Sequence, residues 1–231
     1  MAEVEGSKDL ISVLWSGADI LRSKMDANEY KDYLLGIVFY KYLSDTFLIK
    51  VYDLIYDEKP KSLKVALDAY KEALEDESAE ELKEQIKSEC HYLIEPQLTY
   101  TCFADAARNN AFNRELLQKA FNNIEQSDPL FVDLFTDIDL YSNRLGNGDQ
   151  KQSDTISSLV KEIDKADLLN SDAEILGNAY EYLIGQFASE TGKKAGEFYT
   201  PQAVSKILTR IAIAGQEDRR GLSVYDPCMG S

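Results

Sequence analysis

The sequence has few of the residues that build disulfide frameworks or metal centres. It contains three cysteines, an odd number without CxxC spacing, and one histidine, His91, which lies beside Cys90. Two adjacent side chains do not make a metal site, so we interpret His91 as an ordinary surface or packed residue. This cysteine usage argues against a disulfide framework or a zinc site and favours a reducing cytosol.

Long apolar runs are also missing. No stretch approaches the roughly 20 residues that are needed to span a bilayer. The best candidate, Tyr33 to Leu43, is interrupted by Lys41, and the opening residues MAEVE lack the basic and apolar regions of a secretory signal. We therefore expect no membrane association and a cytoplasmic location.

Positive charge is scarce: 25 lysines and arginines stand against 41 aspartates and glutamates, for a net charge of −16. Such a surface repels a phosphate backbone, which binds to clustered Lys and Arg. If the protein works on nucleic acid, we expect a basic partner, or a later part of the same polypeptide, to supply most of the affinity. The alternative is that the acidity serves solubility alone.

What the sequence does have is helical periodicity over at least its first two hundred residues. Asp26, with Glu29 three positions later, predicts the start of a long helix with a wide apolar face, and a similar helix precedes it. The charged stretch from Asp57 to Glu89 predicts one or two solvated outer helices. Residues 93–101 predict extended chain or loop. The fold class expected from these patterns is mainly α.

The clearest break is the glycine-rich, polar stretch at residues 145–153. We expect a helical N-terminal domain over residues 1–150 and a second domain over 151–231. The apolar spacing after the break predicts a helix that ends near Asp167, and residues 175–187 predict another.

Towards the end of the chain, Thr200 and Pro201 predict a helix start, because Thr caps free backbone N–H groups and Pro is tolerated at the first helical position. The helix behind them has one apolar face. Phe198 and Tyr199 place flat side chains at its mouth, where they can stack on a purine. The alternative is a capped helix with two core aromatics and no ligand.

Residues 221–225 predict a strand, and Asp226 follows at its carboxyl end, where ligands bind in open α/β sheets. Gly230 lets a backbone approach a ligand closely. The loop has one Gly after the strand instead of the G-x-G-x-x-G set, and it lacks Gly-Lys-Ser/Thr. An acidic first residue suits an amino group or a ribose hydroxyl better than a phosphate.

The segments GEFYTP (196–201) and DPCMGS (226–231) resemble the S-adenosylmethionine half-site of N6-adenine DNA methyltransferases. More narrowly, with residues 14–36 and 176–196, the chain resembles the methylation (modification) subunit of type I restriction–modification systems. The resemblance implies a helical N-terminal domain followed by the truncated start of a Rossmann-like α/β methyltransferase domain. It also implies cofactor contacts at Glu197, Phe198, Tyr199, Thr200, Pro201, Gln202, Asp226, Gly230 and Ser231.

One position departs from the family pattern. Met229 stands where the family more often has Cys, Ala or another small residue, which weakens the match of the loop.

The family's catalytic tetrapeptide, of the Asn-Pro-Pro-Phe type, is absent. The nearest look-alike, Asp128-Pro129-Leu130-Phe131, lacks the second Pro and precedes the cofactor loop, so we interpret it as an ordinary turn. The expected protein is therefore an N-terminal fragment of an adenine N6-methyltransferase subunit, inactive by itself. In the family that the chain resembles, this tetrapeptide positions a flipped adenine for methyl transfer.

The resemblance implies partners as well. They are a specificity subunit that reads the DNA and a restriction subunit that cleaves it, with a second methylation subunit as a further candidate. The alternative function is a helical interaction module without transferase activity, which leaves the strand and the 226–231 loop unexplained. An S-adenosylmethionine enzyme acting on RNA or protein, or a nicotinamide enzyme, fits these motifs less well.

Overall fold

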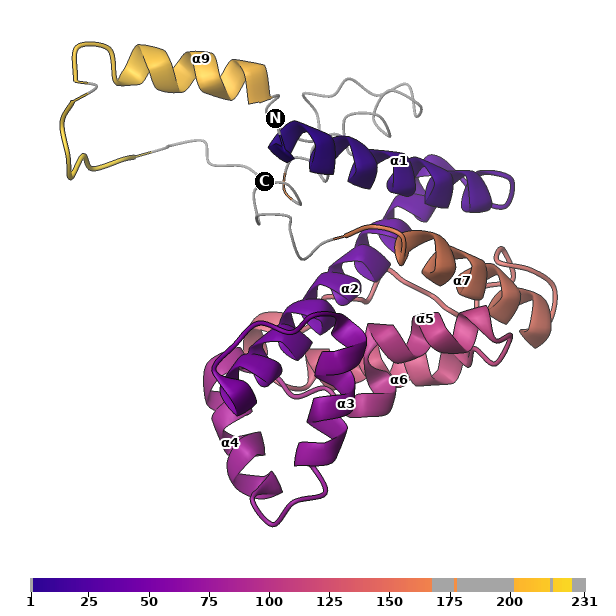
Figure 1. Ribbon diagram of the computed structural model, residues 1–231. Helices are drawn as coiled ribbons and strands as arrows, with labels where there is room; N and C mark the ends of the chain where they lie inside the picture. The colour runs from indigo at the N-terminus through magenta and orange to yellow at the C-terminus, as the bar shows by residue number, and fades with distance from the viewer. Residues whose placement is uncertain (1, 168–176, 178–201, 217, 226–231) are drawn as a thin grey trace. The chain divides into compact units, whose positions relative to one another are not determined.

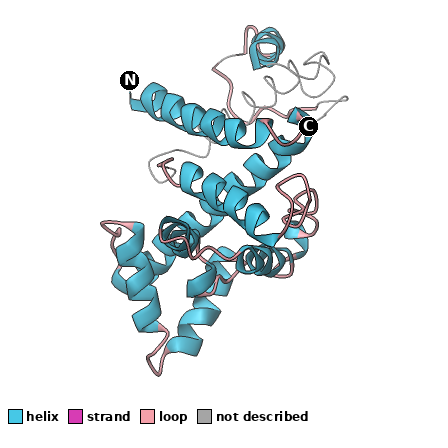
Figure 2. Ribbon diagram, turned by 90° about the vertical axis from the view of Figure 1, so that its right-hand side faces the viewer, coloured by secondary structure: helices cyan, strands magenta, loops and turns pink. Residues whose placement is uncertain are grey.

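The computed structural model describes residues 2–167, 177, 202–216 and 218–225 (Figure 1). The chain divides into two compact units, residues 1–179 and 180–231. Within the described ranges every regular element is a helix, and no strand is present (Figure 2). The prediction of a mainly helical chain is confirmed.

The first unit contains seven α-helices and two short 3₁₀ turns among its described residues. Their bounds are α1 Ala2–Arg22, α2 Ala27–Tyr56, α3 Leu63–Ala73, α4 Ala79–Cys90, η1 Pro96–Leu98, α5 Tyr100–Arg108, α6 Arg114–Glu125, η2 Pro129–Phe131 and α7 Asp149–Ile163. The charged stretch after Asp57 thus forms two helices, α3 and α4, as its pattern predicts. In the second unit the described helix is α9, Gln202–Ala212.

The long helix α2 is the centre of the first unit. It packs against α1, α3, α4, α5 and α7, with α3 and α4 at one end and α1 and α7 at the other (Figure 1). Its start is stabilised by a backbone hydrogen bond from the Asp26 N–H to the Glu29 carboxylate, at 3.4 Å. Asp57 ends the helix in the left-handed conformation, with φ of 55°. The predicted helix start is therefore confirmed.

Two glycines allow helices to approach closely. A Cβ on Gly17 of α1 would lie 2.8 Å from Leu34 Cδ2 and 3.1 Å from Leu159 Cδ1. A Cβ on Gly36 of α2 would overlap Ile138, which lies in the segment after η2. Both contacts are possible only because glycine has no side chain. Gly17 therefore allows α1 to pack closely on α2 and α7, and Gly36 allows the 131–145 segment to pack closely on α2.

Aromatic rings fill the core between α2, α6 and the 131–145 segment. Phe121 and Phe135 stack with centroids 4.2 Å apart and planes 7° apart, and Tyr40 meets both rings edge-on. The Tyr40 hydroxyl is fully buried, and it donates to the carbonyl oxygen of Leu98 at 2.7 Å. The polar end of a large buried side chain is thus satisfied by a backbone acceptor.

The extended chain or loop predicted for residues 93–101 is correct up to Thr99, apart from the short 3₁₀ turn η1, and wrong at residues 100–101, where the helix α5 begins. The Thr99 hydroxyl accepts a hydrogen bond from the Cys102 N–H at 3.4 Å and caps the helix. Tyr100, Phe103, Ala104 and Ala107 are buried on one face. Local β preference at Thr99 and Tyr100 is overridden by this burial.

Residues 222–225 correct another expectation, because they form no strand. Val224 and Tyr225 are 92% and 87% exposed. A strand needs a neighbour to pair its backbone N–H and C=O groups. The described part of the chain supplies no such neighbour, so the segment's β-favouring residues do not make a ladder there.

The glycine-rich break at residues 145–153 forms a fixed turn into α7. The Arg114 guanidinium donates to Gln152 and, at 2.5 Å, to Asp149, and it lies 4.4 Å from the centroid of the Tyr141 ring. Beyond the turn, α7 packs against α1 and α5. The helix that opens the expected second domain is thus in contact with the helical unit, and the boundary at residue 150 stays a prediction.

Candidate functional site

Of the nine residues expected to bind the cofactor, the structure describes only Gln202, the first residue of α9. Residues 197–201, Asp226, Gly230 and Ser231 lie outside the described residues, as does the predicted helix at 175–187 apart from Gly177. These site assignments stay predictions.

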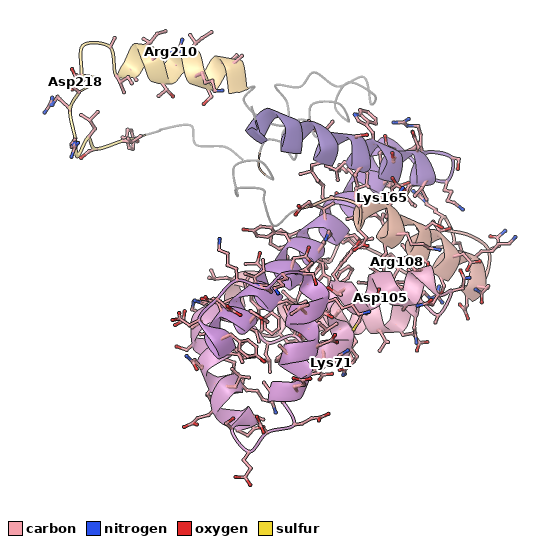
Figure 3. The ribbon with its side chains drawn as sticks, viewed as in Figure 1. Lys71, Asp105, Arg108, Lys165, Arg210 and Asp218 are labelled. Atoms are coloured by element: carbon pink, nitrogen blue, oxygen red, sulfur yellow. The ribbon has the colours of Figure 1, made fainter. Side chains whose placement is uncertain are left out.

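Helix α9 has the amphipathic form that its spacing predicts. Val204, Ile207, Leu208 and Ile211 are 44%, 58%, 57% and 67% exposed. Their spacing of i, i+3, i+4 and i+7 makes one apolar stripe along the helix. Arg210 and Asp218 belong to the same unit, on α9 and on the chain after it (Figure 3). The stripe is a surface suited to packing against another element.

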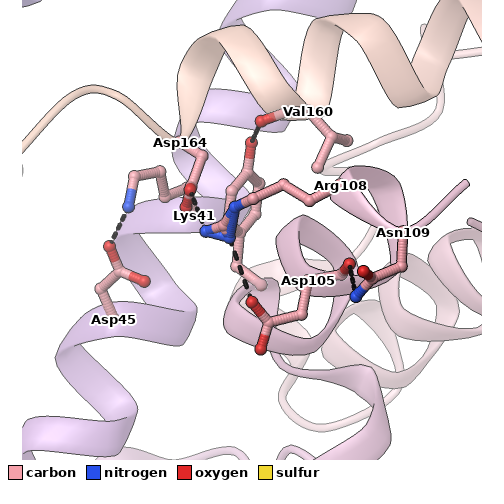
Figure 4. A network of polar contacts seen from close by, with 8 residues as sticks. Lys41, Asp45, Asp105, Arg108, Asn109, Val160 and Asp164 are labelled. Carbon is pink, nitrogen blue, oxygen red and sulfur yellow. Dashed lines mark hydrogen bonds and ion pairs between the residues drawn. The ribbon is translucent and has the colours of Figure 1, made fainter. Parts of the chain in front are cut away.

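The helical unit contains a buried ion pair that the sequence reading did not single out (Figure 4). Lys41 Nζ lies 2.5 Å from an Asp45 carboxylate oxygen, and the two side chains are 4% and 1% exposed. Lys41 also lies 5.2 Å from the centroid of the Tyr100 ring, whose hydroxyl donates to the Val160 carbonyl at 2.9 Å. The pair therefore joins α2 to α5 and α7.

Burial dominates the electrostatics of this pair. Desolvation raises the pKa of Asp45 to about 6, although the charge of Lys41 and its hydrogen bond act in the opposite direction. The carboxylates of Asp164 and Asp167 raise this pKa further. The second oxygen of Asp45, Oδ1, has no hydrogen-bond partner within the described chain. The ionised form of Asp45 is thus only partly compensated.

A second ion-pair chain lies beside the buried pair and is more exposed. Arg108 of α5 lies 3.1 Å from Asp105 and 2.7 Å from Asp164 at the carboxyl end of α7 (Figures 3 and 4). Exposed pairs of this kind contribute little to stability, typically about 0–1 kcal/mol. The sequence signal for the buried pair was available: Lys41 interrupts an apolar helix face and stands four residues before Asp45.

Metal and membrane sites are both missing from the described ranges. No cluster of three or more His, Cys, Asp or Glu side chains there is arranged to hold a metal ion. Nor does any helix in these ranges have the length and apolar character to cross a bilayer.

Comparison with known families defines the class of protein. The family model described as "HsdM N-terminal domain" matches residues 10–163, and the one described as "N-6 DNA Methylase" matches residues 171–231. The first model covers most of the chain and coincides with the described helical unit. The chain belongs to the family of type I restriction–modification methylation subunits, whose N-terminal part it matches.

Individual relatives agree. The chain is 30% identical to the type I restriction enzyme MpnII methylase subunit of Mycoplasma pneumoniae over 94% of its own length and 41% of the relative's. It is 27% identical to the MjaIX methylase subunit of Methanocaldococcus jannaschii, covering 94% of this chain and 37% of that one. It thus spans about two fifths of the length of these curated relatives.

A solved structure supports the fold. The crystal structure of the type I restriction-modification system methyltransferase subunit from Streptococcus thermophilus superposes with a TM-score of 0.84 and 49% sequence identity, over 94% of this chain and 46% of that one. The family and the fold class predicted from the sequence are therefore confirmed.

Proposed function

We propose that the intact protein is a site-specific DNA adenine N6-methyltransferase subunit of a type I restriction–modification complex that uses S-adenosylmethionine. The observation that carries this proposal is the order of the two family matches, the HsdM N-terminal domain at 10–163 and the N-6 DNA methylase at 171–231. This chain then contributes a helical interaction domain and the first part of the cofactor pocket. It works in the cytoplasm and is inactive alone, because it carries no catalytic tetrapeptide.

The proposed cofactor segment has a chemistry that fits S-adenosylmethionine. Phe198 and Tyr199 offer flat faces to the adenine ring, and Asp226 accepts hydrogen bonds from a ribose hydroxyl or an amino group. The exposed stripe of α9 supports a Rossmann-like arrangement, because helices in such domains cover a sheet with their apolar faces. When bound, the cofactor supplies the methyl group, and these residues hold and orient it.

The acidity of the chain supports a division of labour. The whole chain has a net charge of −16, so it is poorly suited to bind a phosphate backbone. DNA contact and base reading then belong largely to a specificity subunit, while cleavage belongs to a restriction subunit. A second methylation subunit is a further partner under this proposal. We also propose that the helical domain extends through α7, since α7 packs on α1 and α5.

The test is a cofactor titration of the full-length protein by calorimetry. Asp226→Ala and Tyr199→Ala are each expected to weaken S-adenosylmethionine binding at least tenfold, which is about 1.4 kcal/mol. Asp218→Ala, an exposed acidic residue on the same unit, is the matched control and is expected to bind normally. Unchanged affinity in both site variants would remove the site assignment. A full-length protein that binds no cofactor and transfers no methyl group would leave the alternative, a helical interaction module.

A further inference from the structure

The segment after α6 exposes three large apolar side chains in a row of alternate positions. Leu130, Val132 and Leu134 are 87%, 60% and 38% exposed. We call these three residues the Leu130 patch. Isolated exposed apolar residues are ordinary, but a contiguous group is typical of an interaction surface. None of the three takes part in the proposed cofactor pocket.

The backbone that carries the patch is firmly anchored. The buried Phe135 ring stacks on Phe121, and the Phe135 N–H donates to the Glu125 carboxylate at 2.7 Å. On the other side, the Phe131 ring meets Tyr92 edge-on, with centroids 5.8 Å apart. Because the loop is held by these contacts, the three apolar side chains of the patch stay exposed to solvent.

The turn within the patch also has a fixed conformation. Asp128 accepts a hydrogen bond from the Leu130 N–H at 2.9 Å and starts η2, which confirms that this sequence is an ordinary turn. Asp133 has a φ of 63°, in the left-handed region that Asp tolerates better than most residues. Since the conformation is already fixed, a partner that binds here loses little free energy to ordering of the loop.

The acidic residues around the patch favour a partner with positive charge. No lysine or arginine lies between Lys119 and Arg144, while the same stretch carries Glu125, Asp128, Asp133, Asp137 and Asp139. None of the four aspartates forms a salt bridge with a described residue. One of them, Asp137, reaches α2: burial raises the pKa of Asp32, the charge of Lys31 lowers it, and the charge of Asp137 raises it again. An apolar surface with an acidic border fits a segment that is apolar and basic.

Two other occupants fit poorly. A second copy of this chain would bring another acidic surface from a molecule with a net charge of −16, so the two would repel each other. A nucleic acid would bring phosphates to the same border and offers nothing that buries leucine side chains. A protein partner remains.

We propose that the Leu130 patch is a docking site for an apolar, lysine- or arginine-bearing segment of another protein subunit in the same complex. This inference rests on the proposed function for the existence of that complex. The surface itself follows from the exposure of the three side chains, the anchored loop and the acidic border.

A photo-cross-linking experiment tests it with the full-length protein assembled with its specificity and restriction subunits. A benzophenone amino acid is introduced at position 130 and, as a control, at position 65, because Val65 is 40% exposed on α3. The position-130 protein is expected to cross-link to a basic segment of another subunit, and the control is not. Cross-links only within the same chain, or to a second copy, would overturn the proposal.

A binding measurement separates the patch from the complex as a whole. The double variant Leu130→Ser/Val132→Ser is expected to bind the cross-linked subunit at least tenfold more weakly than wild type, whereas Val65→Ser binds normally. Raising the salt from about 50 to about 300 mM is expected to weaken the wild-type complex, because it screens the acidic border. Equal affinity of all variants would sink the patch and leave the proposed function standing. Failure of the wild type to bind either subunit would instead refute the proposed function.

Discussion

Helices α7 and α9 have the same amphipathic pattern but opposite surroundings. The apolar stripe of α7, Ile156, Leu159, Val160 and Ile163, is fully buried. The matching stripe of α9 is 44–67% exposed. The i, i+3, i+4, i+7 spacing therefore predicts that a helix forms and which face is apolar. Whether that face is covered depends on which other elements surround it.

Truncating one leucine or isoleucine in each stripe gives the largest expected contrast. Leu159→Ala removes a fully buried side chain that packs against Gly17, and we expect a loss of about 2–5 kcal/mol. Ile207→Ala on α9 is expected to change stability by less than about 0.5 kcal/mol. Urea unfolding of the 231-residue chain, followed by circular dichroism, measures both.

Similar losses from the two truncations would break the comparison. In that case the α9 stripe would be buried in solution against some other element.

The second prediction concerns the buried ion pair Lys41–Asp45 in the core of the helical unit. Lys41→Met leaves the Asp45 carboxylate buried without its partner, and breaking a buried pair typically costs about 3–5 kcal/mol. We expect the lower end of this range, because Asp45 can take up a proton once Lys41 is gone. The matched control is Lys83→Met on α4, whose partner Glu80 is 82% exposed. Its cost is expected to stay below about 1 kcal/mol.

The double variant Lys41→Met/Asp45→Leu decides what the buried pair does. Replacing a buried pair with apolar residues of similar size is often neutral or stabilising. Recovery to near wild-type stability is expected if the pair is merely tolerated by the core. A double variant as unstable as the single one would mean that the pair is needed for the packing of α2 against α5 and α7.

Particular residues show which elements of the fold could be predicted from the sequence. The start of α2 at Asp26, the two charged helices α3 and α4, and the turn at Asp128 follow from capping, charge and turn chemistry, which act over a few residues. Helix α5 does not, because burial of Phe103 by neighbours distant in sequence outweighs local preference. Pairing needs a partner strand, so residues 222–225 were mispredicted for the same reason.

In the candidate site, too, local features were predictable from the sequence and tertiary features were not. The family was predicted from the resemblance of short motifs, GEFYTP and DPCMGS, to those of its members. The cofactor contacts at residues 197–201 and 226–231 lie outside the described residues and stay predictions. The buried pair was readable in part: its i, i+4 spacing is local, but the burial that shifts the Asp45 pKa is tertiary.

The smallest expected effect is a pH dependence that comes from Asp45 alone. Burial raises its pKa in the folded chain to about 6, from an ordinary value of 3.8. Between about pH 4 and pH 6 the folded state binds more protons at this site than the unfolded state does, so this contribution to stability falls as the pH rises. The slope is at most about 1.4 kcal/mol per pH unit.

Measuring wild type and Asp45→Asn at several pH values isolates this contribution, since the other carboxylates are common to both proteins. The free energy of unfolding of the wild type minus that of Asp45→Asn is expected to decrease from pH 4 to pH 6 and to level off above it. Asp68→Asn on the exposed face of α3 is the control for the loss of one surface carboxylate. A difference that rises with pH would mean that Lys41 holds Asp45 ionised, and that attraction to the ammonium group outweighs desolvation in this core.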